Sequence, residues 1–237
     1  MERHWHANVR DTLVVLLTVT TGVVDAACFL GLGSVFSSVI TGNLVLLGVA
    51  AGTQSVTLAA HSGVALAGYS AGVAVGAPLA ARRAAGRGTW PPSVTVTLSA
   101  ELFLMSLVSV GWELTRASRG LATQLALVGT LAACMGMQGA AVRQLGQMST
   151  TYLTSTLTGV VGALATRTRL AALPRSVGVL AAIVTGAVIG SVVVKVAPAW
   201  LPAAMLAPLG AVIVLSVAGF EPVREHMSAA RENPGDQ

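Results

Sequence analysis

Two acidic residues, Asp25 and Glu101, lie inside long apolar stretches of this 237-residue sequence. If those stretches cross a membrane, each carboxylate costs about 2.5–3.5 kcal/mol on insertion scales and marks an ion, proton or substrate pathway. Asp25 could carry a proton or cation or accept a hydrogen bond from a substrate; it could equally fasten two helices together. Glu101 has no basic residue in its own stretch, so its partner would come from another one, and pathway and structural roles are both open.

Two shorter apolar stretches, residues 38–52 and 149–166, each begin with a cluster of Ser, Thr and Gly. The candidate pathway residues in them are Thr41, Gly42 and Asn43 in the first and Thr151, Thr154 and Thr156 in the second. Helix interiors disfavour these residue types, and a broken backbone is tolerated at membrane depth only inside protein or beside a water-filled cavity. The clusters therefore predict short spans or re-entrant segments that line a pathway. The alternative is that they only pack helices together.

The histidines and cysteines have no spacing that would build an enzyme site or bind a metal. The four histidines form no H-E-x-x-H pattern, and the sequence contains no G-x-S-x-G elbow and no phosphate loop. Cys28 and Cys134 both fall in apolar stretches, which indicates neither a disulfide nor a zinc site. His61, near the predicted outer end of its stretch, is interpreted as structural. We expect no enzyme activity, no metal and no cofactor.

The composition is that of a membrane protein. Hydrophobic residues make up 54% of the chain and charged residues 10%, with a mean hydropathy of +0.77, whereas soluble domains carry about 25% charged residues. Six stretches approach the roughly 20 apolar residues that a span requires: 11–32, 56–81, 92–113, 120–141, 175–196 and 199–220. We predict an all-α transmembrane protein whose single membrane domain, 1–221, contacts the lipid bilayer and is followed by a polar, disordered tail, 222–237.

The positions of the basic residues predict the orientation of the spans. With six spans and a cytoplasmic N-terminus, eleven basic residues face the cytoplasm and three, Arg116, Arg119 and Lys195, face outward. If both short stretches also crossed, the division would be nine to five. The positive-inside rule therefore favours six spans with both termini in the cytoplasm. For the same reason the net charge of +5 is assigned to orientation and not to a nucleic-acid partner.

The two halves of the sequence, about 11–113 and 120–220, resemble one another. A shift of 113 residues aligns Asp25–Leu44 with Gln138–Leu157, with five of twenty positions identical and Gln138 opposite Asp25. Glycines at helix-packing spacing also correspond in the two halves: Gly68, Gly72 and Gly76 in the first and Gly186 and Gly190 in the second. Because each half would contain three spans, an odd number, the halves would form inverted repeats.

These observations support two functional hypotheses. The first is a permease or channel for a small polar solute, with the two broken segments meeting near the membrane midplane and proton coupling through Asp25. Gln138 would either bind the solute or join two helices. The second is a non-transporting scaffold or regulatory partner of another membrane protein, in which the same residues only pack helices. The Gly68–Gly76 face could also serve a homo-oligomer.

The sequence resembles the YoaK-like family of bacterial multi-pass membrane proteins, a domain of unknown function. The resemblance rests on "GVVDAACFLGLGSVFSSVITGNLVLLG" and on "MGMQGAAVRQLG…TTYLTSTLTG". It implies a location in the bacterial cytoplasmic (inner) membrane and marks five positions: Asp25, Thr41, Gly42, Asn43 and Gln138. This sequence departs from the family pattern at Gly139 and Ser155, where the family has Asn and Gly. The resemblance supports the fold and implies no particular activity.

Overall fold

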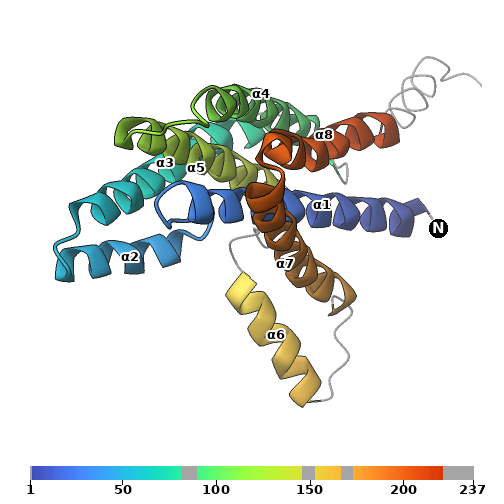
Figure 1. The fold of residues 1–237 in the computed structure, drawn as a ribbon. Coiled ribbons are helices and arrows are strands. Elements are labelled where there is room, and N and C mark those ends of the chain that lie inside the picture. The colour runs from blue at the N-terminus through green and yellow to red at the C-terminus, as the bar shows by residue number, and fades with distance from the viewer. Residues whose placement is uncertain (1, 82–89, 146–152, 167–172, 221–237) are drawn as a thin grey trace, which may run out of the picture.

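The computed structural model describes residues 2–81, 90–145, 153–166 and 173–220 (Figure 1). Within these ranges the chain is helical and has no strand, which confirms the predicted all-α class. The helices are α1 (Glu2–Gly31), α2 (Ile40–Gly52), α3 (Val56–Ala81), α4 (Pro92–Leu114), α5 (Leu121–Gln144), α6 (Leu153–Ala165), α7 (Leu173–Val196) and α8 (Leu201–Phe220), with a short 3₁₀ turn, Pro198–Trp200, before α8.

Six of these helices are long and apolar enough to cross a membrane, as predicted. Their apolar parts are Val9–Gly31, Val56–Ala81, Pro92–Leu114, Leu121–Gln144, Arg175–Val196 and Pro198–Ala218. The other two, α2 and α6, have 13 residues each. At 1.5 Å per residue a helix of that length reaches about 20 Å, less than the roughly 30 Å of a hydrocarbon core.

The end of α1 lies beside the start of α3 and the end of α4. A Cβ added to Gly31 at the end of α1 would lie 2.9 Å from the ring of Trp112, near the end of α4. A Cβ added to Gly33 would overlap the imidazole of His61, in the second turn of α3. We call this side of the bundle the Gly33 end. Helices α1 and α4 therefore run toward it, and α3 runs away from it.

At the opposite side of the bundle, α4 begins beside the ends of α3 and α8. Ser93 Oγ at the start of α4 donates a hydrogen bond of 2.6 Å to the carbonyl of Ala80 near the end of α3. Two residues further on, the hydroxyl of Thr95 shares a hydrogen bond of 3.2 Å with that of Ser216 in α8. Helix α8 therefore runs in the direction of α3.

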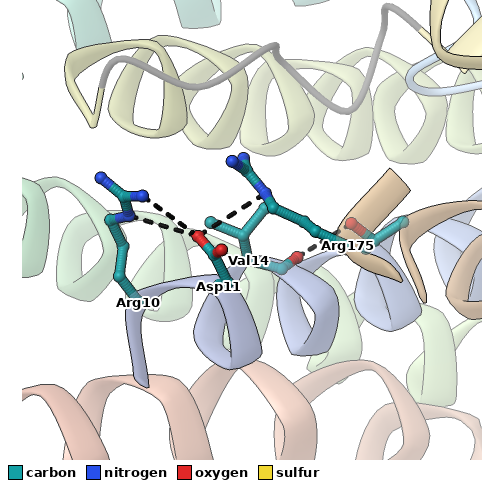
Figure 2. Close-up of polar contacts among 5 residues, drawn as sticks. Arg10, Asp11, Val14 and Arg175 are labelled. Carbon is teal, nitrogen blue, oxygen red and sulfur yellow. Dashed lines mark hydrogen bonds and ion pairs between the residues drawn. The ribbon is translucent and has the colours of Figure 1, made fainter. Parts of the chain in front are cut away.

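Polar contacts place the starts of α5 and α7 at opposite ends of the bundle. Gln124 near the start of α5 lies 3.1 Å from His61 Nε2, at the Gly33 end. Arg175 near the start of α7 forms an ion pair with Asp11 of α1, with Nε 3.6 Å from Oδ1 (Figure 2). Asp11 also pairs with Arg10 at 3.2 Å. We call this side the Asp11 end; α5 runs toward it and α7 away from it.

These directions decide the number of spans. The chain leaves α1 and enters α3 at the same Gly33 end, and it leaves α5 and enters α7 at the same Asp11 end. Neither α2 nor α6 therefore adds a crossing, which agrees with six spans and two re-entrant segments and not with eight spans. Corresponding helices of the two halves, α1 and α5, α3 and α7, α4 and α8, run in opposite directions.

Two helix pairs, α1 with α7 and α3 with α5, form the most extensive contacts in the bundle. Each pair approaches through glycines. A Cβ on Gly22 would meet the carbonyl of Ile183 and lie 2.7 Å from Ala187 N. A Cβ on Gly136 would meet the carbonyl of Tyr69 and lie 2.9 Å from Val73 N. Because glycine has no side chain, the two helix backbones can pack closely at these positions. In lipid, where no hydrophobic effect draws helices together, such close packing stabilises the helix pairs.

The two crossings repeat one geometry. The partners of Gly22 and Gly136 match residue for residue at a shift of 114, the interval from Gly22 to Gly136. The glycines singled out in the sequence, Gly68, Gly72, Gly76, Gly186 and Gly190, lie in the same two contacts, the first three against α5 and the others against α1. The sequence alignment used a shift of 113 at this point. At the shift of the structure, Gln138 corresponds to Val24 and not to Asp25.

Candidate functional site

Between α1 and α2 the chain leaves helical geometry and turns back along α1. Gly33 and Ser34 adopt positive φ angles of 88° and 59°. Gly33 is required there for two reasons, because a side chain would be strained at this φ and would collide with His61. This pair of left-handed residues ends α1 and reverses the chain. We call residues 32–52, the reversal together with α2, the first re-entrant segment.

The carboxylate of Asp25 holds the returning chain. Its Oδ1 accepts hydrogen bonds from Ser37 N at 2.8 Å, Ser37 Oγ at 2.7 Å and Ser38 N at 2.9 Å. Its Oδ2 accepts a fourth from Ser38 Oγ at 2.5 Å. All three residues are buried. Because all four contacts donate to it, Asp25 acts here as an acceptor that satisfies two backbone N–H groups left free by the break.

Asn43 fixes the same stretch from the other side. Its Oδ1 accepts a hydrogen bond from Phe36 N at 3.0 Å, and its Nδ2 donates one to Phe36 O at 2.6 Å. The ring of Phe36 stacks on Phe29 of α1, with ring centroids 5.1 Å apart. We call Asp25 and Asn43, with the backbone of residues 36–38 that they hold, the latch. The latch explains why polar residues cluster at the start of α2.

The latch lies deep in the bundle. Asp25 precedes the last residue of α1 by six positions, which corresponds to about 9 Å along the helix axis. The chain therefore returns along α1 as far as Asp25 before α2 leads to the start of α3 (Figure 1). Of the other candidates at this break, Thr41 is exposed and Gly42 is half-buried beside the side chains of Val39 and Phe36.

Gln138 lies on the face of α5 toward α1 and not at the latch. Its Nε2 donates hydrogen bonds to Leu17 O at 3.2 Å and to Thr21 Oγ1 at 2.8 Å. Its Oε1 is buried and accepts no hydrogen bond from any described residue. Gln138 thus joins two helices through its amide N–H groups while its carbonyl oxygen stays unpaired.

Glu101, in the middle of α4, is fully buried, with 0% of its surface exposed. Neither carboxylate oxygen accepts a hydrogen bond from any residue that the structure describes. Glu101 interacts electrostatically with Cys134 of α5, which precedes Gln138 by one helical turn. The structure therefore holds two buried acceptor groups that no described residue pairs, the carboxylate of Glu101 on α4 and the carbonyl oxygen of Gln138 on α5.

The candidates of the second half lie on α6, which contacts α7. Thr154 is exposed and Thr156 is buried, while Thr151 lies outside the described residues. The structure therefore does not bring the two polar clusters into one set of described contacts. Among the residues described, no group of three or more His, Cys, Asp or Glu could hold a metal ion.

Sequence reasoning missed the partners of Asp25. Ser37 and Ser38 supply all four of its hydrogen bonds, yet neither was among the candidate residues. A signal was available, because two adjacent serines before a helix break offer hydroxyls and unpaired backbone N–H groups to a nearby acceptor. The distance of twelve residues between Asp25 and Ser37 concealed the contact.

Comparison with known proteins identifies the family. The sequence model of a family described as "Protein of unknown function (DUF1275)" matches residues 13–218. The chain belongs to this family. The match includes five of the six candidate spans completely, the first span from residue 13 onward, and the latch.

A curated relative points the same way. The chain is 33% identical over 154 residues to the UPF0700 transmembrane protein YoaK of Bacillus subtilis (strain 168). That alignment covers 64% of this chain and 66% of YoaK, just under two thirds of the relative. No solved structure matches the chain. These likenesses, with the six apolar helices, make this DUF1275 chain a bacterial multi-pass membrane protein and confirm the predicted YoaK-like resemblance.

Proposed function

We propose that this chain is a permease or channel for a small polar solute, built from two inverted repeats. The observation that carries the proposal is the repeated crossing, in which α1 packs on α7 as α5 packs on α3, with corresponding helices running in opposite directions. Inverted repeats with interrupted segments near the midplane are a common plan of secondary transporters. A protein that only anchors a partner has no need of this symmetry.

The interleaved packing suggests which parts move. Each tight pair takes one helix from each half, and α1 also contacts α8 as α5 contacts α4. The chain can thus be divided into two bundles, α1–α7–α8 and α3–α4–α5, which contact each other mainly through α4 and α8 and only slightly through α1 and α5. Rocking of one bundle against the other would open the region around Gln138 and Glu101 to each side in turn, which is alternating access.

Uptake into proteoliposomes tests the proposal. The purified chain would be reconstituted and offered a panel of radiolabelled amino acids, monosaccharides, nucleobases and small carboxylic acids, with protein-free liposomes as the control. We expect at least one solute to enter faster in the presence of protein and to be displaced by the same unlabelled solute. If no solute enters and none binds to the folded protein, the transport function should be abandoned.

The alternative, a helical scaffold or regulatory partner, is favoured by one observation. Each side-chain oxygen or nitrogen of Asp25 and Asn43 forms at least one internal hydrogen bond, so these two candidate pathway residues have a sufficient structural role. Under this alternative the region around Glu101 never meets water. The solvent access of the two polar clusters distinguishes the two functions.

A further inference from the structure

Glu101 is the acidic group of the bundle that packing leaves unexplained. Its side chain is fully buried in α4 between Leu98 and Met105, which are also fully buried. Both of its oxygens lack a hydrogen-bond partner among the described residues. Asp25 offers the contrast, because the same chemical group, also buried, receives four donated hydrogen bonds.

The helices around α4 provide no positive charge to neutralise Glu101. Helix α4 packs on α3, α5 and α8. The titratable side chains that these helices carry within the span are Cys134 of α5 and Tyr69 and His61 of α3; the described part of α8 has none. His61 lies at the Gly33 end and is engaged with Thr57 O and Gln124. Arg143 is exposed near the end of α5.

An ionised carboxylate in such surroundings is strongly disfavoured. A buried charge loses its hydration, and without an ion pair or hydrogen bonds no other interaction compensates that loss. A hard metal cation does not supply the missing positive charge, since such ions require about six oxygen ligands, and the described residues contain no group of three or more His, Cys, Asp or Glu that could hold one. A proton removes the difficulty, because the neutral acid needs no counter-charge.

We infer that Glu101 is a reversible proton-binding site in the centre of the bundle. This inference deepens the proposed function: if the chain transports a solute together with a proton, Glu101 carries that proton and Asp25 keeps the structural role of the latch. Rocking of the bundle containing α4 and α5 against the other bundle would then expose the protonated group to each side in turn. The presence of the proton itself does not depend on transport.

Labelling with dicyclohexylcarbodiimide tests the inference. This apolar reagent adds covalently to protonated carboxyl groups, and the labelled residue is located by mass spectrometry of peptides. Reconstituted wild-type protein would be treated between about pH 4 and pH 9, a range that covers ordinary and buried glutamates. The controls are Glu101→Gln, which removes the site, and Asp25 in the same sample, a buried carboxylate with saturated hydrogen bonding.

We expect label on Glu101 that falls at least tenfold from the acidic to the alkaline end, no label on Asp25, and none in Glu101→Gln. A second measurement, the infrared band of a protonated carboxyl group, should be present in wild type and lost in Glu101→Gln. Absence of both signals would overturn the inference, and so would labelling that is independent of pH, which means a proton that never leaves. Label on Glu101 in a protein that transports no solute would support the proton-binding site and contradict the permease function.

Discussion

Substitution of Asp25 separates a structural carboxylate from a proton carrier. Asn keeps the size of Asp, and its Oδ1 can still accept the hydrogen bonds from Ser37 N, Ser37 Oγ and Ser38 N. Its Nδ2 would face Ser38 Oγ, which can turn its hydroxyl to accept. Leu has a similar size and can accept none of these bonds. We therefore expect Asp25→Asn to retain the latch and Asp25→Leu to lose it.

The contacts set the size of the effect. Hydrogen bonds between membrane helices average about 0.6 kcal/mol, so the loss of all four gives roughly 2.4 kcal/mol. Leaving the N–H groups of Ser37 and Ser38 buried and unpaired raises this figure, since each orphaned donor costs about 1–3 kcal/mol. We predict that Asp25→Leu lowers the free energy of unfolding by about 2–5 kcal/mol. For Asp25→Asn the predicted loss is about 1 kcal/mol or less, the difference between a charged and a neutral acceptor.

Unfolding in mixed micelles, followed by circular dichroism as the denaturing detergent is increased, measures these differences. If a transported solute is found, the pH dependence of its accumulation in Asp25→Asn is the second readout, and the latch predicts a wild-type profile. The reasoning would be refuted if Asn destabilised the protein as much as Leu did, because the charge and not the hydrogen bonds would then matter. If Asp25→Asn were stable but had lost pH-dependent accumulation, the coupled proton would have to be assigned to Asp25.

Two further predictions concern packing and topology. Gly72→Ala and Gly186→Ala should each destabilise the fold by about 1–3 kcal/mol, the usual cost of overpacking. The reason is that an added Cβ would overlap a backbone carbonyl of the facing helix. Gly63→Ala, where a Cβ meets nothing within 4 Å, is the matched control and should be neutral in the same detergent titration. Reporter domains fused after Arg87 and after Arg169 should both report the cytoplasm, because both positions fall in arginine-rich parts of the sequence between predicted spans. An external signal from either fusion would contradict the six-span arrangement.

The number and length of the spans could be predicted because the bilayer imposes them. A span needs about 20 apolar residues whatever its neighbours are, so hydropathy alone placed all six within a few residues of the helices found. That the two short segments do not cross could also be predicted, because six spans divide the basic residues eleven to three and eight spans nine to five.

The partners of the polar residues could not be predicted in the same way. That Asp25 binds Ser37 and Ser38 depends on the reversal at Gly33 and Ser34, where two positive φ angles direct the chain back along α1. The pairing of Asp25 with Gln138 depended on a shift of 113 residues, and the helix crossing uses 114. One residue of register rotates a helix by about 100°, which moves a side chain to another face. Amino-acid composition does not determine on which face of a helix a residue lies, so it could not predict these contacts.

The most direct test of the inverted-repeat permease is the side from which each re-entrant segment meets water. In a background with Cys28→Ala and Cys134→Ala, single substitutions Thr41→Cys and Thr154→Cys would be treated with a membrane-impermeant thiol reagent, first from outside intact cells and then from inside in inverted vesicles. Gln54→Cys, exposed at the Gly33 end, is the control for labelling from outside.

We predict that Thr41→Cys reacts only from outside and Thr154→Cys only from the cytoplasmic side, because inverted repeats bring the two breaks toward the midplane from opposite sides. Reaction of both positions from the same side would contradict the inversion. Protection of both positions from both sides would contradict a water-lined pathway and leave the scaffold as the function of this chain.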